Sequence, residues 1–375
     1  MDTPTTAVID RQGLDELLAE LVSRGYRTLG PVVADGAVVT REVTSCVDLP
    51  AGWHDEQGPG RYRLHHHDGN GRLFAWAVGP TSPKALFFPP KEVVWRAAAG
   101  ENGPVPVEVE GDDRAVALVG IRPCEVAALR ILDGVLSGGA VTDPGYRARR
   151  EAAVVVVAEC GEPAGTCFCG SMGTGPGCEA GFDLALTEIG RGARWRVVVR
   201  SGSALGAELL AGITVEPITG TDEEARHKVL ASARARMGRR LEVEGLAAAL
   251  EAAQEDPGWA AVADRCLSCG NCTLVCPTCF CSDVEDVSDL SGGLERRRRW
   301  ASCFDLDHSY LHGGAVRPTV QSRYRQWLTH KLSSWWEQFG TSGCVGCGRC
   351  ITWCPVGIDL TEEATALAAG RRTVP

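Results

Sequence analysis

Short apolar runs, broken by Gly, Pro and Asp, fill residues 31–220 of the chain. The β-branched runs among them predict buried strands, at 115–121, 152–158, 183–189 and 194–200. Helical patterns lie around these strands, at 13–24, 124–136 and 203–211. Two further segments, 62–67 and 72–78, flank the turn sequence Asp68-Gly69-Asn70-Gly71 and predict a β-hairpin. This half is therefore predicted to be a mixed α/β domain.

The pattern changes at residue 221, where Ala, Glu, Arg and Leu dominate and proline is absent as far as residue 254. One or two helices are predicted there, and further helices at 320–338 and 361–370. Cysteine-rich loops separate these helices. The expected fold class is α+β, with a mixed α/β domain over 1–220 and a mainly helical domain over 221–375.

Composition and charge exclude several classes of protein. A chain of 375 residues suggests roughly two to three domains, and 44% hydrophobic residues exclude wholesale disorder. No apolar stretch approaches ~18 residues, and the first residues lack a basic segment followed by an apolar run. We therefore expect no membrane span, no secretory signal and a cytoplasmic location. A net charge of −10 argues against nucleic-acid binding.

The decisive residue type in the composition is cysteine. Seventeen cysteines in a chain without an export signal indicate metal ligands in preference to disulfides. Two late bursts, 266–277 and 344–355, share the spacing C-x2-C-x2-C-x3-C-P of bacterial two-cluster ferredoxins. In such runs the fourth cysteine ligates the other cluster. The predicted ligands are Cys266, Cys269, Cys272 and Cys354 for one [4Fe–4S] cluster, and Cys344, Cys347, Cys350 and Cys276 for the second.

The spacing also bears on the kind of cluster domain. Structural zinc is the alternative, but zinc ribbons use two separated C-x2-C pairs. Small residues such as Gly270, Gly346 and Gly348 let backbone N–H groups point at the sulfurs. The 67 residues between Cys276 and Cys344 suggest the α-helical ferredoxin arrangement of larger electron-transfer enzymes. Two such clusters would pass single electrons from one to the other, and we assign no catalytic residue.

The early cysteines suggest a further site. Cys124 and Cys160 each follow a predicted strand, and adjacent parallel strands would bring them together at one sheet edge. With Cys167 and Cys169 they make four thiolates, near a helix N-terminus that favours an anion. The hypothesis is a third [4Fe–4S] cluster, with Cys178 as a substitute ligand. The alternative is a set of reduced thiols in a buried loop.

Several long motifs resemble one known family. They are GIRPCEVAALRILD, TCFCGSMGTGPGCEAGFDL, CLSCGNCTLVCPTCFC, RYRQWLTHKL and CVGCGRCITWCPVGIDL. Together they resemble the β subunit of soluble NADP-linked [NiFe] hydrogenases (sulfhydrogenases), and the corresponding iron–sulfur subunit of anaerobic sulfite reductase is similar. The match extends from about residue 80 to residue 360.

The resemblance implies an iron–sulfur subunit that relays electrons and is not itself the catalytic subunit. Its implied partners are an FAD/NAD(P)-binding flavoprotein subunit, a small iron–sulfur subunit and a large nickel–iron subunit. The implied alternative is the electron-transfer subunit of an anaerobic sulfite or sulfur reductase complex.

Other features receive a simpler interpretation. His65, His66 and His67 alternate across a strand and are expected at a solvated hairpin tip, with a metal site as the alternative. The run Arg296–Arg299 is expected on a solvated face, with a docking patch or a counter-charge to a cluster as alternatives. The Gly-rich stretch 170–177 lacks the dinucleotide fingerprint and is expected to be a tight loop. Cys279, Cys281 and Cys303 receive no role.

Overall fold

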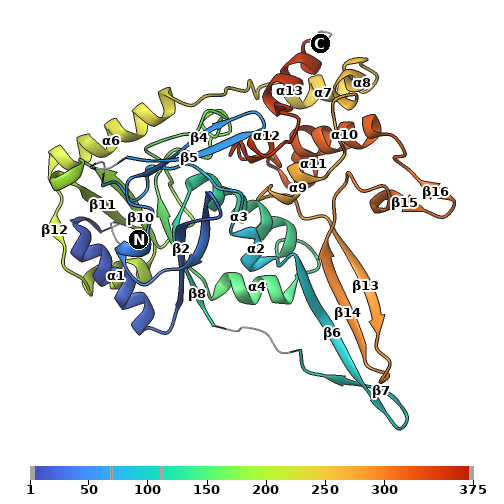
Figure 1. Cartoon of the computed structure of the whole chain (residues 1–375), viewed down its shortest axis with the longest axis horizontal. Coiled ribbons are helices and arrows are strands. Elements are labelled where there is room, and N and C mark those ends of the chain that lie inside the picture. The colour runs from blue at the N-terminus through green and yellow to red at the C-terminus, as the bar shows by residue number, and fades with distance from the viewer. Residues whose placement is uncertain (1–4, 68, 70, 110–113, 371–375) are drawn as a thin grey trace.

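The computed structural model describes residues 5–67, 69, 71–109 and 114–370. Its largest element is an eight-stranded sheet in the order β12-β1-β11-β10-β9-β8-β2-β3 (Figure 1). The strands of this sheet are β1 (Thr6–Ile9), β2 (Arg27–Ala34), β3 (Ala37–Glu42), β8 (Val116–Ile121), β9 (Val154–Ala158), β10 (Leu184–Ile189), β11 (Arg196–Ser201) and β12 (Glu216–Pro217).

The sheet is mixed, with a parallel centre and antiparallel edges. Strands β2, β8, β9 and β10 are parallel neighbours, whereas the pairs toward β12 and β3 are antiparallel. Helices α1 (Arg11–Ser23) and α5 (Ala204–Ala211) pack on one face, against Val119 and Val156. Helices α3 (Pro123–Leu136) and α4 (Pro144–Glu151) cover the other, against Leu118 and Val157. Alternate residues thus fill two cores, as expected of central strands buried on both faces.

The strand and helix predictions for the first half are confirmed, but the predicted hairpin is wrong. The segment at 62–67 pairs instead with the preceding residues, as β4 (Trp53–Gly58) and β5 (Arg61–His66). Gly60, with φ of +66°, makes the tight turn between them. Residues 72–78 are buried without regular structure, and Asp68 and Asn70 lie outside the described residues.

The second half contains the predicted helices. The region 221–254 forms two of them, and the region 320–338 is one helical segment interrupted by a π-helical turn. These helices are α6 (Gly220–Ala235), α7 (Leu246–Ala252), α8 (Gly258–Ala263), α9 (Asn271–Leu274), α10 (Val320–Thr329), the π turn (His330–Ser334), α11 (Trp335–Phe339), α12 (Arg349–Thr352) and α13 (Leu360–Ala368). Their core is built on large side chains such as Trp259, Trp327 and Leu328.

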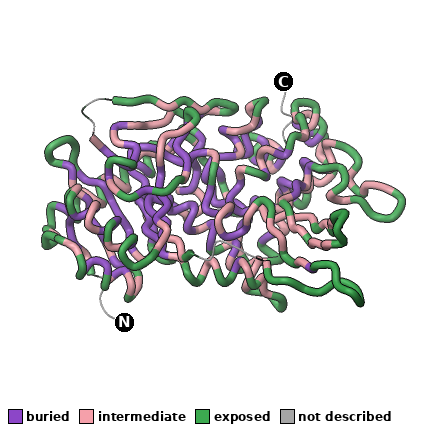
Figure 2. Tube along the Cα trace, turned by 60° about the horizontal axis from the view of Figure 1, so that its bottom comes forward, coloured by how far each residue is buried: buried purple, intermediate pink, exposed green. Residues whose placement is uncertain are grey.

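The expectation that this half is mainly helical is wrong. Strands β13 (Ser282–Ser288) and β14 (Leu294–Trp300) join β6 (Lys91–Gly100) and β7 (Gly103–Val107) in an antiparallel sheet of order β13-β14-β6-β7. This sheet projects from the body as an arm, and its tip is exposed (Figures 1 and 2). The arm unites segments from both sides of residue 220, where the proposed domain boundary stays a prediction.

Short elements complete the description. They are α2 (Lys84–Phe87), the strand pair β15 (Tyr310–Leu311) and β16 (Gly314–Ala315), and the 3-10 turns Cys46–Asp48, Gly192–Arg194 and Asp307–Ser309. Among the described residues, no helix is both long enough and apolar enough to cross a bilayer.

The arginine run lies in strand β14 and is paired with acidic residues across the arm. Arg296 contacts Asp286 at 2.7 Å on the exposed side of the strand. Arg298, largely buried, pairs with Glu92 of β6 and with Asp143. Opposite charges on neighbouring strands stabilise a sheet, so these arginines help to hold the arm together.

A buried carboxylate ties helix α6 to the sheet. Glu159 directly follows β9 and accepts hydrogen bonds from Arg200 at 3.0 Å and from Arg226 of α6 at 2.9 Å. Burial alone would raise the pKa of Glu159, but the hydrogen bonds and charge of Arg226 hold it below its ordinary value. The carboxylate is therefore ionised. The next residue in the chain is Cys160, one of the early cysteines.

Replacing Glu159 by Ala should lower the free energy of unfolding by about 3–5 kcal/mol, because two arginines lose their buried counter-charge. The measurement is urea unfolding of the full chain followed by circular dichroism. Glu224→Ala removes one partner of the exposed Lys228–Glu224 pair and should change stability by less than about 1 kcal/mol. Equal stabilities of the two variants would contradict this account.

Candidate iron–sulfur sites

The two C-x2-C-x2-C-x3-C-P motifs fold into the same local structure. In each, the third cysteine, Cys272 or Cys350, is the second residue of a one-turn helix, α9 or α12. A glycine with a left-handed backbone precedes each helix: Gly270 has φ of +71° and Gly348 of +77°. Other residues rarely adopt this conformation, so glycine is needed where each cysteine loop turns into its helix.

Backbone N–H groups point at the sulfurs in both motifs. Ser268 N lies 3.4 Å from Cys266 Sγ, and Gly346 N lies 3.4 Å from Cys344 Sγ. Each donor is two residues beyond its cysteine, so the loops present their thiols in the same way. The expectation of such contacts is confirmed for Gly346.

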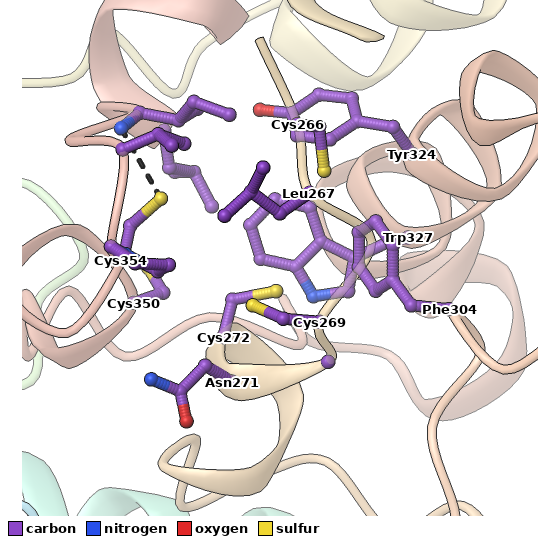
Figure 3. A pocket seen from close by; sticks show the side chains of 15 residues that line it. Cys266, Leu267, Cys269, Asn271, Cys272, Phe304, Tyr324, Trp327, Cys350 and Cys354 are labelled. Carbon is purple, nitrogen blue, oxygen red and sulfur yellow. Dashed lines mark hydrogen bonds between the residues drawn. The ribbon is translucent and has the colours of Figure 1, made fainter.

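Site 1 denotes Cys266, Cys269, Cys272 and Cys354. These thiols face one cavity, with Cys350 at its edge and an empty space of about 460 Å³ including its open mouth (Figure 3). Phe304, Tyr324 and Trp327 form an aromatic wall on one side. The fourth cysteine, Cys354, comes from the second motif, and Ile358 N donates to its sulfur at 3.3 Å.

Site 2 denotes Cys344, Cys347, Cys350 and Cys276. Burial raises the pKa of Cys350 well above its ordinary value, and the nearby Cys344, Cys347 and Cys276 raise it further. The structure thus brings the fourth cysteine of the first motif to the second motif. Cys276 Sγ accepts from Lys331 Nζ at 3.3 Å.

Site 3 denotes Cys124, Cys160, Cys167 and Cys169. Strands β8 and β9 are adjacent and parallel, and Cys124 and Cys160 follow their carboxyl ends, Cys124 in the first turn of α3. Burial raises the pKa of Cys167 well above its ordinary value, with Cys169 and Cys160 close enough to add to it. Cys169 also lies near Cys124. The four early cysteines are therefore neighbours.

The loop of site 3 packs directly on the second motif. Phe168 N donates to Gly346 O at 2.9 Å, and Thr166 Oγ1 lies 2.8 Å from Thr352 Oγ1. A side-chain carbon on Gly348 would stand 2.5 Å from Thr166 O, and one on Gly346 would stand 2.7 Å from Cys169 Cα. Both glycines are thus required by close approach as well as by their backbone conformation.

The donor sets fit a [4Fe–4S] cluster chemically. Each site offers four thiols, the ligand type that such clusters take. Burial raises the pKa of Cys124, Cys167 and Cys350 well above the ordinary value, so metal binding must drive their deprotonation. A positive charge also lies near the thiols of sites 2 and 3: Arg349 is close to Cys347 and Cys124. Its Nη1 is buried with no hydrogen-bond partner among the described residues, so it is free to donate to a group bound there.

Sites 3, 2 and 1 follow one another in space. Cys347 of site 2 lies close to Cys124 and Cys169 of site 3. At the other end, Cys272 of site 1 lies close to Cys276 of site 2. Exposure rises along this series, because all four thiols of site 3 are buried and site 1 includes an exposed one, Cys269.

Five further cysteines are not members of the three sets. Cys178 packs with Phe182 and donates to Ala180 O at 3.5 Å, so it does not join site 3. Cys279 neighbours Cys276, and Cys281 neighbours Cys303 and His308. Cys46 is buried, and its thiol donates to Arg11 O at 3.6 Å.

A site for a single metal ion, as distinct from a cluster, was the alternative interpretation of the three histidines. Within the described parts of the chain, no three His, Cys, Asp or Glu side chains are spaced to hold one ion. His65, His66 and His67 are exposed at the end of β5, where His67 stacks on His54 with ring centroids 4.5 Å apart. The histidines are exposed as expected, but they do not lie at a hairpin tip, because the chain turns at Gly60, at the other end of β5.

The sequence interpretation missed three buried cations near the sites. They are Lys331 beside Cys276, Lys84 beside the Cys279 carbonyl, and Arg349, which pairs with Glu125. Residues 266–277 and 344–355 give no hint of the two lysines, because both come from distant segments. Arg349 stands inside the second motif and could have been singled out by its place between two cysteines.

Comparisons with known proteins agree with this geometry. Residues 265–358 match the 4Fe-4S dicluster domain family. The sulfhydrogenase 2 subunit beta of Pyrococcus furiosus is 35% identical over 291 residues, which cover 77% of this chain and 83% of that protein. The chain belongs to the sulfhydrogenase β-subunit family. As a member of that family it is an iron–sulfur protein with [4Fe–4S] clusters. No solved structure matches it.

The double variant Cys124→Ala/Cys169→Ala should lose about four of about twelve irons per chain, since two ligands of site 3 are removed. Iron analysis of anaerobically reconstituted protein measures this. Cys178→Ala, in the same buried loop, is the matched control and should keep the full complement. About eight irons in the unaltered chain would show that site 3 holds no cluster.

Proposed function

We propose that this chain relays electrons through three [4Fe–4S] clusters held at sites 3, 2 and 1. The observation that carries the proposal is the succession of four-cysteine sets, from fully buried at site 3 to partly exposed at site 1. A cluster at each site would supply one-electron redox chemistry. The crossed placement of Cys276 and Cys354 keeps sites 1 and 2 next to each other.

The chain's own residues perform the supporting tasks. Cysteine thiolates hold the irons, and backbone N–H groups such as Ser268 N and Gly346 N stabilise the negative charge on sulfur. The aromatic wall of site 1 limits access of water to that cavity. Cys269 is exposed, so site 1 is the end at which a partner's redox group can approach.

We infer the partners from the family. The Pyrococcus relative is named as a sulfhydrogenase subunit. The motifs of this chain resemble the subunit that stands between an FAD/NAD(P)-binding flavoprotein and the small subunit of a cytoplasmic [NiFe] hydrogenase. In that complex the chain would carry electrons between NADP(H) and the hydrogenase, without a substrate site of its own.

The isolated, reconstituted chain should show the EPR signals of reduced [4Fe–4S] clusters. It should nevertheless oxidise neither hydrogen nor NADPH, because it holds only the relay. Both activities are measured with an artificial electron acceptor. Hydrogen oxidation by the isolated polypeptide would overturn the proposal.

Purification of the native complex tests the choice of partner. We expect nickel and a flavin in stoichiometric amounts with this chain. Sirohaem in place of nickel would assign the chain to a sulfite-reducing complex and would overturn the hydrogenase assignment.

A further inference from the structure

Sites 1 and 2 are built alike but differ at one sulfur. In each, the fourth thiol comes from the other motif and accepts a hydrogen bond at 3.3 Å, and Cys276 Sγ also lies 3.1 Å from Thr278 Oγ1. At site 1 the donor to Cys354 Sγ is the neutral backbone N–H of Ile358. At site 2 the donor to Cys276 Sγ is the ammonium group of Lys331. The two sites therefore differ by a full positive charge in contact with an equivalent ligand.

Lys331 is held in place by the fold. It lies in the π-helical turn His330–Ser334, a kind of irregularity that is frequent at functional sites. Its Nζ donates to Thr278 Oγ1 at 3.1 Å and to Gly343 O at 3.0 Å as well as to the sulfur. The residue is only 3% exposed, so its ammonium group cannot turn to solvent.

The charge of Lys331 faces thiols. Its Nζ lies 3.3 Å from Cys276 Sγ, and Cys279 and Cys344 are also close to it. Within the described ranges, Lys331 forms no ion pair with a carboxylate. A buried ammonium group is costly unless an anion offsets it, and the thiolates of an occupied site 2 supply that anion.

Other cations also lie near the two sites. Arg265, near site 1, is paired with Glu363 at 2.6 Å. Arg323 donates to Ser268 Oγ and to backbone carbonyls. Near site 2, the buried Lys84 donates to the carbonyl of Cys279 at 3.1 Å and adds a second ammonium group. The guanidinium group of Arg323 thus contacts a hydroxyl and carbonyls, whereas the ammonium group of Lys331 contacts the cysteine sulfur itself.

We propose that Lys331 sets the reduction potential of the cluster at site 2 above that of the cluster at site 1. Reduction adds one electron to a cluster without making or breaking a bond, and the added negative charge is stabilised by a nearby cation. The hydrogen bond to Cys276 Sγ acts in the same direction. This inference rests on the proposed function, since it assumes that both sites hold clusters. Of these two sites, site 2 is then the one at which an electron resides.

The test is a redox titration of the reconstituted full-length chain, followed by EPR, with dithionite as the electron donor. In Lys331→Met, the ratio of reduced to oxidised cluster at site 2 should fall about tenfold at a fixed ambient potential. For a one-electron couple this is a downward shift of about 59 mV. The signal of site 1 should titrate as in the unaltered chain.

Two further variants separate charge from structure. Lys331→Gln keeps a hydrogen-bond donor but removes the charge, and it should lower the potential as Lys331→Met does. Lys331→Arg keeps the charge and should leave the potential near its original value. Lys228→Met, which removes an exposed lysine of α6, is the control and should change nothing.

The outcomes are distinguishable from failure of the proposed function. A chain with eight or more irons whose potentials are the same in Lys331→Met and Lys331→Gln as in the unaltered chain overturns the role of Lys331 but not the relay. A shift in Lys331→Met that is absent in Lys331→Gln would also overturn it, since charge would then not be the cause. A chain that binds no iron–sulfur cluster overturns the proposed function itself.

Discussion

The contact between two cysteine loops is the constraint on which the arrangement of the three sites depends. The loop that carries Cys167 and Cys169 lies backbone to backbone against the second motif, at Gly346 and Gly348. Neither glycine leaves room for a side chain, so the distance between sites 3 and 2 is set by main-chain packing. Rigid spacing of this kind suits a relay, because it leaves the separation of neighbouring redox groups independent of side-chain motion.

Buried charges reinforce the same junction. Arg349 of α12 reaches Glu125 of α3 and the carbonyls of Gly79 and Thr81, so one guanidinium joins the sheet domain to the cluster-bearing loops. Lys331, by contrast, has no carboxylate in the described structure and faces thiols. The first cation is neutralised by the protein alone, whereas the second is neutralised only when its site is filled. Occupation of site 2 is therefore expected to stabilise the fold around the π turn as well as to create a redox centre.

The sequence was most informative where local spacing carries the chemistry. The cysteine motifs predicted the loops and the crossed positions of their fourth cysteines, and apolar periodicity predicted the central strands and most helices. It was least informative about non-local pairing. Strand β14 carries four arginines and has no β-branched residue, so nothing local indicates a strand. Strand β6 and acidic neighbours such as Asp286 stabilise it. Lys331 escaped notice for the same reason, because 55 positions separate it from the thiol that it contacts.

The arm has a consequence for how the protein is made. Strand β6 leaves the ribosome about 200 residues before β14, so at first it has only β7 as a neighbour. A lone two-stranded ribbon is marginally stable in water. The nascent chain must therefore carry an open strand edge until the first cysteine motif and β14 have both been synthesised. Closure of the arm consequently belongs to the last stages of folding, together with the meeting of the two motifs.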